Sequence, residues 1–182
     1  VYKRQSELGA LTPTNDPVGG VMILRGKRDS HGNLSFTPDT IWSGVGRVAD
    51  VEPVDAGNGK KDLVVAEFGD HTIGSITYLR NDTTDWNNPV FTPHVIDLIT
   101  GTIHVPVCNL TGHGNKDFIA VISQEHEQVA LFLYKSRGVY QEKVIYSGSH
   151  PAVGSSGISL TDLKHTGHTD VLYTSGDLFD PH

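Results

Sequence analysis

Cysteine is nearly absent from the 182-residue chain, in which Cys108 is the only one. A single cysteine excludes an intrachain disulfide framework, a cysteine-rich zinc site and a c-type haem attachment, because each needs more than one thiol. The sequence also has no apolar run near the roughly 20 residues that span a bilayer. It therefore predicts no transmembrane segment, and the apolar neighbours Val107 and Leu110 predict a buried, inert thiol at Cys108.

Positive charge is also scarce, with 14 Lys and Arg against 21 Asp and Glu and a net charge of −7. Nucleic acids and anionic membranes both attract clustered positive charge. The composition therefore predicts neither partner.

No stretch shows a sustained 3.6-residue apolar period with helix caps. The nucleophile elbow Gly-x-Ser-x-Gly is missing as well: Ser155 and Ser156 lie in Gly-Ser-Ser-Gly, away from any predicted strand-to-helix turn. The sequence therefore indicates an all-β fold, and it predicts no catalytic residue.

What the chain does have is an internal repeat. Gly-x-x-Asp followed by an apolar run occurs at Asp62, Asp117 and Asp170, with spacings of 55 and 53 residues. Phe-Thr-Pro occurs at 36–38 and again at 91–93, also 55 residues apart. Because independent landmarks agree on one period, we interpret the chain as a repeat protein.

Each repeat is predicted to contain four short strands, which in one copy cover 103–110, 117–122, 128–135 and 140–146. Four strands in a repeat of about 50 residues are typical of a β-propeller blade. The chain is thus expected to be one partial propeller domain, 1–182, with about three and a half blades. The predicted repeats are 1–47 (partial), 48–102, 103–155 and 156–182 (partial).

A closed propeller typically has 4–8 blades. Three and a half blades would leave unpaired sheet edges and uncovered sheet faces. We therefore expect the 182 residues to be part of a longer propeller, or to be completed by another chain. The predicted partner is a protein, or the remaining blades.

The hairpins Asn109–Asp117 and Asp162–Asp170 resemble the motif of the FG-GAP/VCBS repeat family, whose blades also occur in integrin α propellers. The hairpin 54–62 matches with Asp55 displaced by one position, and the resemblance extends over essentially the whole chain. Segments 66–69 and 123–127 are similar to a subgroup in secreted multidomain bacterial proteins, some with a separate cytochrome c module. The resemblance implies an extracytoplasmic location: periplasm, cell surface or exterior.

The resemblance also implies calcium as the candidate cofactor, because the family hairpin often binds it through acidic oxygens. The sequence departs from that motif, with Lys164 at one ligand position and Val54 and Ala56 at others. We therefore favour the aspartates that open the apolar runs as turn caps that accept backbone N–H groups. The candidate calcium ligands are Asp55, Asn58, Asp62, Asn109, Asp117, Asp162 and Asp170.

The order of strands predicts a second site. Gly-rich hairpins occupy one face of a propeller, so the loops after the second strand and the connections between blades share the opposite rim, where binding residues concentrate. The His and Glu residues suggest a metal site, with loop-tip hydrogen bonding as the favoured alternative. Glu67 is interpreted first as a structural carboxylate and second as a catalytic one. The rim candidates for ligand binding are Glu67, His104, Gln124, Glu125, His126 and Asp177.

Three functions remain open at this stage. The first is a non-enzymatic protein-binding or assembly module of an extracytoplasmic protein or complex. The second is an accessory subunit of an enzyme or of a cytochrome-linked electron-transfer complex. The third is a carbohydrate-binding propeller with a glycan partner, in which Trp42 or Trp86 stacks on a sugar; packing between blades is the favoured role of both. Fold alone does not choose among them.

Overall fold

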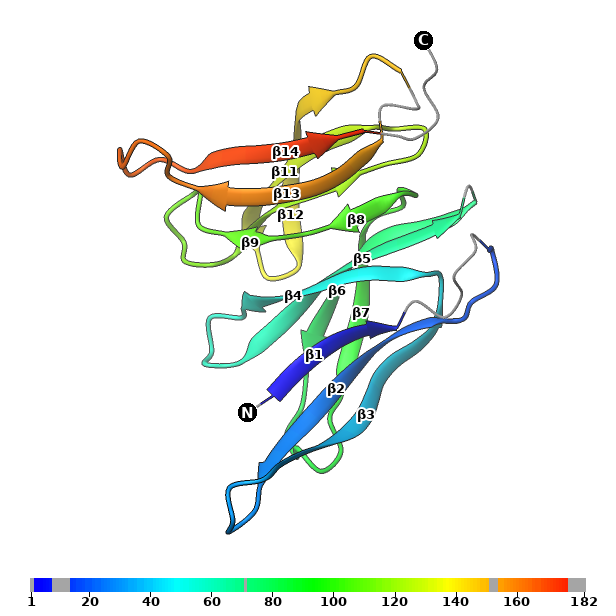
Figure 1. Cartoon of the computed structure of the whole chain (residues 1–182), viewed down its shortest axis with the longest axis vertical. Helices are drawn as coiled ribbons and strands as arrows, with labels where there is room; N and C mark the ends of the chain where they lie inside the picture. The colour runs from blue at the N-terminus through cyan, green and yellow to red at the C-terminus, as the bar shows by residue number, and fades with distance from the viewer. Residues whose placement is uncertain (1, 8–13, 71, 151–153, 177–182) are drawn as a thin grey trace.

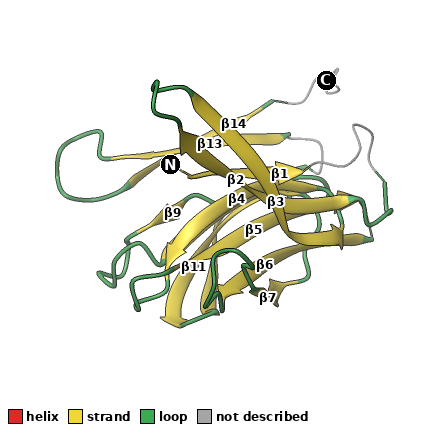
Figure 2. Cartoon of the chain, turned by 90° about the horizontal axis from the view of Figure 1, so that it is seen from below, coloured by secondary structure: helices red, strands yellow, loops and turns green. Residues whose placement is uncertain are grey.

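The structure is a computed structural model that describes residues 2–7, 14–70, 72–150 and 154–176. These residues form only strands and loops (Figure 2), which confirms the all-β class. In this described part, no helix is long and apolar enough to cross a membrane.

The strands form four antiparallel sheets, and each sheet is built from strands that are consecutive in the chain. The first contains β1 (Tyr2–Glu7), β2 (Gly19–Arg28) and β3 (Leu34–Val45). The second contains β4 (Val48–Asp55), β5 (Lys61–Asp70), β6 (Ile73–Asn81) and β7 (Phe91–Asp97). The third contains β8 (Thr102–His104), β9 (Val107–Cys108), β10 (Asp117–Ile122), β11 (Gln128–Ser136) and β12 (Val139–Ser147). The fourth contains β13 (Ser155–Thr161) and β14 (Asp170–Ser175).

Most of the strands predicted for the third repeat are confirmed, as β10, β11 and β12. The expected single strand over 103–110 is instead divided into β8 and β9, which both pair with β10. Pro106 lies between them and has no N–H to contribute to the ladder. The N–H of Val105 also leaves the ladder, because it donates to Asp50 Oδ2 at 3.0 Å.

The sheets follow one another in chain order, from the blue β1–β3 end to the orange and red β13–β14 end (Figure 1). An apolar cluster fills each space between consecutive sheets. The largest cluster joins the second sheet to the third and contains Tyr78, Phe118 and Phe132. Phe118 and Phe132 stack with their ring centroids 4.6 Å apart. A closed propeller stays a prediction at this point.

Strand β5 shows why the repeat carries an unbroken apolar run rather than an alternating one. Leu63 and Val65 pack in the cluster with the first sheet, whereas Val64 and Ala66 pack in the cluster with the third sheet. Successive side chains of a strand point to opposite faces, so a strand covered on both faces is apolar throughout.

Strand β14 has the same sequence pattern but a different environment. Val171, directly after Asp170, packs against the third sheet. Leu172 stands two residues after Asp170, at the position that Val64 and Ile119 occupy in their own repeats. Val64 and Ile119 are fully buried, but Leu172 is 45% exposed. One face of the fourth sheet is therefore open to solvent at Leu172.

Candidate functional site

The hairpin before β10 is closed by Asp117, which is fully buried. Its carboxylate accepts the backbone N–H groups of Leu110 at 2.8 Å and Thr111 at 2.7 Å, and that of Tyr134 on β11 at 2.8 Å. Burial alone would raise the pKa of Asp117, but these hydrogen bonds outweigh it and hold the pKa below its usual range. Turn capping by Asp117 is confirmed.

The hairpin before β14 is capped by a carboxylate in the same way. Asp170 accepts the N–H of Leu163 at 2.9 Å, at the repeat position of Leu110. Asp162 caps the other side by accepting the N–H groups of Thr166 at 2.9 Å and Gly167 at 2.6 Å. These bonds lower the pKa of Asp162. The capping role of Asp170 is confirmed, and Asp162 is a second cap.

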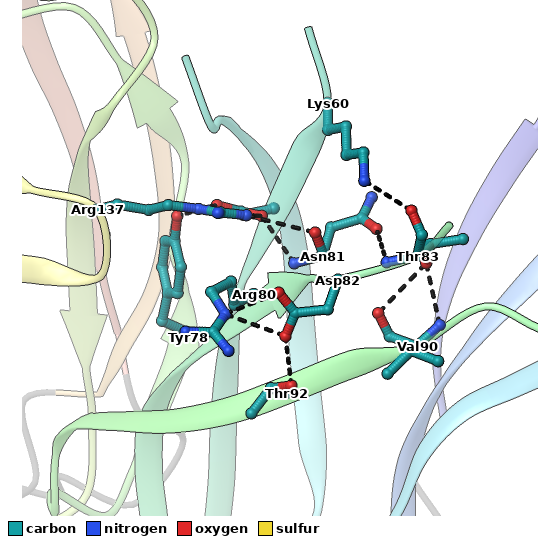
Figure 3. A network of polar contacts seen from close by, with 10 residues as sticks. Lys60, Tyr78, Arg80, Asn81, Asp82, Thr83, Val90, Thr92 and Arg137 are labelled. Carbon is teal, nitrogen blue, oxygen red and sulfur yellow. Dashed lines mark hydrogen bonds and ion pairs between the residues drawn. The ribbon is translucent and has the colours of Figure 1, made fainter. Parts of the chain in front are cut away.

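For Asp62 the prediction of a turn cap was wrong. This fully buried carboxylate accepts two bonds from the guanidinium of Arg137, at 2.7 and 2.8 Å, and one from the N–H of Asn81 at 2.7 Å. The hydroxyl of Tyr78 is its fourth donor. Figure 3 labels the three donor residues, Arg137, Asn81 and Tyr78. Burial raises the pKa of Asp62, but these donors outweigh it, so the pKa lies below its usual range. Arg137 comes from the two-residue turn between β11 and β12, and it therefore links the third sheet to the second.

The remaining candidate calcium ligands are also held by protein groups or exposed. Asp55 pairs with the ammonium of Lys61, and Asn58 Oδ1 accepts the N–H of Lys60 at 3.1 Å. Asn109 is exposed at the start of its hairpin. Within the described ranges, no group of three or more His, Cys, Asp or Glu side chains is arranged to hold a metal ion.

On the side opposite the hairpins, which we name the rim, backbone hydrogen bonds join the loops after the second strands to the connections between sheets. A similar backbone hydrogen bond occurs in the second, third and fourth sheets, shifted by one residue in the second, where β5 has an irregular register near Gly69. In each sheet, an N–H at the end of the second strand donates to the carbonyl of the residue just before the first strand. The three bonds are Gly69 N to Arg47 O at 3.2 Å, Ser123 N to Gly101 O at 2.8 Å, and Gly176 N to Gly154 O at 3.0 Å.

Glu67 lies on this rim and is 9% exposed. Its Oε1 accepts the N–H of Gly46 at 3.0 Å, and its Oε2 accepts the hydroxyl of Ser75 at 3.1 Å. The hydroxyls of Ser75 and Thr77 are 2.7 Å apart. These bonds fix the carboxylate in place, as expected for a structural role, and they leave further acceptor capacity on both oxygens.

A cavity of about 650 Å³, which we name the rim cavity, brings Glu67 and His126 together. Trp42 of β3, Val95 of β7 and Leu98 supply apolar surface to it. Its polar lining consists of Glu67, Thr72, Ser75, Thr77, Thr100 and His126.

The loop that presents His126, residues 123–127, has an unusual backbone. Gln124 and Glu127 adopt positive φ values of 57° and 41°, which are costly for residues other than glycine. The buried carboxylate of Glu127 anchors the loop by accepting the N–H of Ser155 at 2.7 Å and its hydroxyl at 2.5 Å. Gln124 is half-buried, and Glu125 and His126 are exposed.

His104 does not line the rim cavity with His126. Its Nδ1 lies 3.7 Å from Asp50 Oδ2 on β4, so it bridges the first strands of two sheets. The nearby carboxylate of Asp50 is the main reason why the pKa of His104 is raised. His104 is therefore not among the residues that line the rim cavity, and Asp177 lies outside the described residues.

The two tryptophans occupy different cavities. Trp42 packs on the cluster between the first two sheets and also faces the rim cavity. Trp86 is 46% exposed and lines a second, more apolar cavity of about 440 Å³ with Met22, Leu63 and Phe91.

Sequence reasoning missed several of these residues. Arg137 and Tyr78 carried no local signal for their bonds to Asp62, because Arg137 is 75 residues away. The strand order did place Ser155 on the rim, but its bonds to Glu127 were not predicted.

No family model, curated protein or solved structure matches the chain.

Proposed function

We propose that the chain is a non-enzymatic binding or assembly module, built from consecutive blades of an extracytoplasmic β-propeller of the FG-GAP/VCBS type. The docking surface is the fourth sheet, where further strands complete a half-built blade. The observation that carries this proposal is the exposure of Leu172 at a repeat position that is fully buried at Val64 and Ile119.

The edge of the fourth sheet supports the same conclusion. Strand β5 pairs with β4 and β6, and β10 pairs with β11 and with β8 and β9. Among the described residues, β14 pairs only with β13. A free edge strand is a template for another strand, and a two-stranded sheet is marginal until more strands or a packing partner are added.

The repeat also specifies the shape of the partner. In the third sheet, the equivalent edge of β10 is covered by β11, which continues through a tight turn into β12. The partner is therefore a β-hairpin that pairs antiparallel with β14, from a further repeat or another protein. A further sheet that packs on the open face of the fourth sheet then covers Leu172.

A graft tests this proposal. A copy of residues 128–147, the β11–β12 hairpin, is joined after Gly176 through a short Gly-Ser linker. Because the added hairpin pairs with β14 and extends the sheet, we expect the amide protons of β14 to exchange more slowly and the melting temperature to rise. The control graft has the same length and composition in scrambled order. Equal protection of β14 in the two grafts would refute the proposal.

A further inference from the structure

We propose that the rim cavity is a carbohydrate-binding site that takes one or two sugar rings. This inference is independent of the assembly role, because the cavity lies over β3, β6 and β7 with the 123–127 loop, away from β14. Its volume of about 650 Å³ is in the range of small-molecule sites.

The polar side of the cavity matches hydroxyl groups rather than ions. Sugar hydroxyl groups both donate and accept. The hydroxyl of Ser75 already donates to Glu67 and lies 2.7 Å from that of Thr77, so these two buried side chains offer a ligand their acceptor lone pairs. Glu67 adds a fixed acceptor, and His126 offers a donor on one ring nitrogen and an acceptor on the other. A sugar hydroxyl fits these groups as a donor to Glu67, Ser75 or Thr77 and as either partner of His126.

The carboxylate of Glu67 disfavours an anionic ligand, because a like charge in a 9%-exposed position is costly. A metal ion is also disfavoured, since the described residues hold no cluster of three or more metal-ligating side chains. A neutral polyol avoids both costs.

The apolar side of the cavity matches the face of a sugar ring. Trp42 is held by its packing on the core cluster, so little conformational entropy is lost when a ring stacks on it. Val95 is 56% exposed and Leu98 is 82% exposed, and both lie at the same cavity. A pyranose ring presents C–H groups on one face and hydroxyls around its edge, and this division corresponds to the two sides of the cavity.

The strained loop preorganises the site. Gln124 and Glu127 hold positive φ values, and the bonds from Ser155 to Glu127 lock the loop in that shape. Strain of this kind persists where the surroundings over-determine it, and it is concentrated at ligand sites. The strained loop therefore holds His126 in a fixed position at the cavity.

Saturation-transfer NMR with the purified chain tests the proposal. The probes are glucose, galactose, mannose, N-acetylglucosamine, cellobiose, maltose and lactose, each at concentrations up to about 50 mM, which detects millimolar affinity. We expect at least one probe to receive saturation from the protein. His126→Ala and Glu67→Gln should each lower the affinity for that probe about tenfold or more, as expected when a hydrogen bond to a fixed polar group is lost.

The matched control is His94→Ala, which removes an exposed histidine of β7 that does not line the rim cavity. It should leave the affinity unchanged. His126 is exposed, so its replacement decides the question even if Glu67→Gln fails to fold. Absence of saturation transfer to all probes, or equal affinity in the His126→Ala, His94→Ala and unmodified chains, would overturn the proposal.

Discussion

Replacing Arg137 by Met should destabilise the protein strongly, because the change leaves a buried carboxylate without its charged partner. Asp62 is fully buried and receives two bonds from the Arg137 guanidinium. Breaking a buried ion pair costs about 3–5 kcal/mol. The Arg137 side chain is 33% exposed, so water already screens part of the interaction. Asp62 also keeps its bonds from Asn81 and Tyr78.

We therefore expect Arg137→Met to lower the free energy of unfolding by about 2–3 kcal/mol at pH 7. Urea denaturation followed by far-ultraviolet circular dichroism measures this difference. The control is Arg80→Met, which breaks the half-exposed pair with Asp82 and should cost much less, because water screens this pair. The single variant Asp62→Asn and the double variant Asp62→Asn/Arg137→Met complete a double-mutant cycle that isolates the pair.

The pH dependence provides a second readout. The pKa of Asp62 is lowered in the folded protein, so its contribution is fully present above the ordinary carboxyl pKa of about 3.9 and is lost as the pH falls through the folded value. The difference in the free energy of unfolding between the unmodified chain and Arg137→Met should thus be largest at pH 7 and should decrease as the pH falls. A cost no larger than that of Arg80→Met, or a gap that widens in acid, would refute the reasoning.

Three further predictions follow from other parts of the molecule. The pKa of His104 is raised in the folded protein, so its pairing with Asp50 stabilises the fold below about pH 6.5. This contribution is lost as the pH rises through the folded pKa. The melting temperature of His104→Gln should therefore change less over this pH range than that of the unmodified chain. Burial raises the pKa of Cys108 to about 12, so at pH 8 a thiol reagent should label it quickly only after unfolding, and rapid labelling of the native chain would contradict this. Because protein groups already hold the hairpin carboxylates, millimolar calcium should leave the melting temperature unchanged, and a rise of several degrees would show a site.

The sequence predicted those features that depend on local pattern. Strands β10, β11 and β12 follow from apolar runs and turn residues, and Asp117 and Asp170 cap turns only six or seven residues away. Asp62 has the same local motif but a different role, because its partner Arg137 arrives from the next sheet. Local pattern carries no information on such a distant partner.

The candidate site was predictable to a similar degree. Strand order placed Glu67 and His126 on one rim, and the rim cavity contains both. His104 was expected there too, but it pairs with Asp50, because β4 and β8 lie side by side and bring the two side chains together. The contribution of Trp42 depends on how two sheets face each other, which residue spacing alone does not determine.

Amide hydrogen exchange on the unmodified chain tests the central claim most directly, because it compares equivalent strands of the repeat. Strands β5 and β10 are paired on both edges and buried on both faces, whereas β14 pairs with β13 alone among the described residues. An open half-sheet predicts that the β14 amides exchange well before those of β5 and β10, and fastest where they point away from β13. Protection of β14 equal to that of β5 and β10 would contradict an open docking edge.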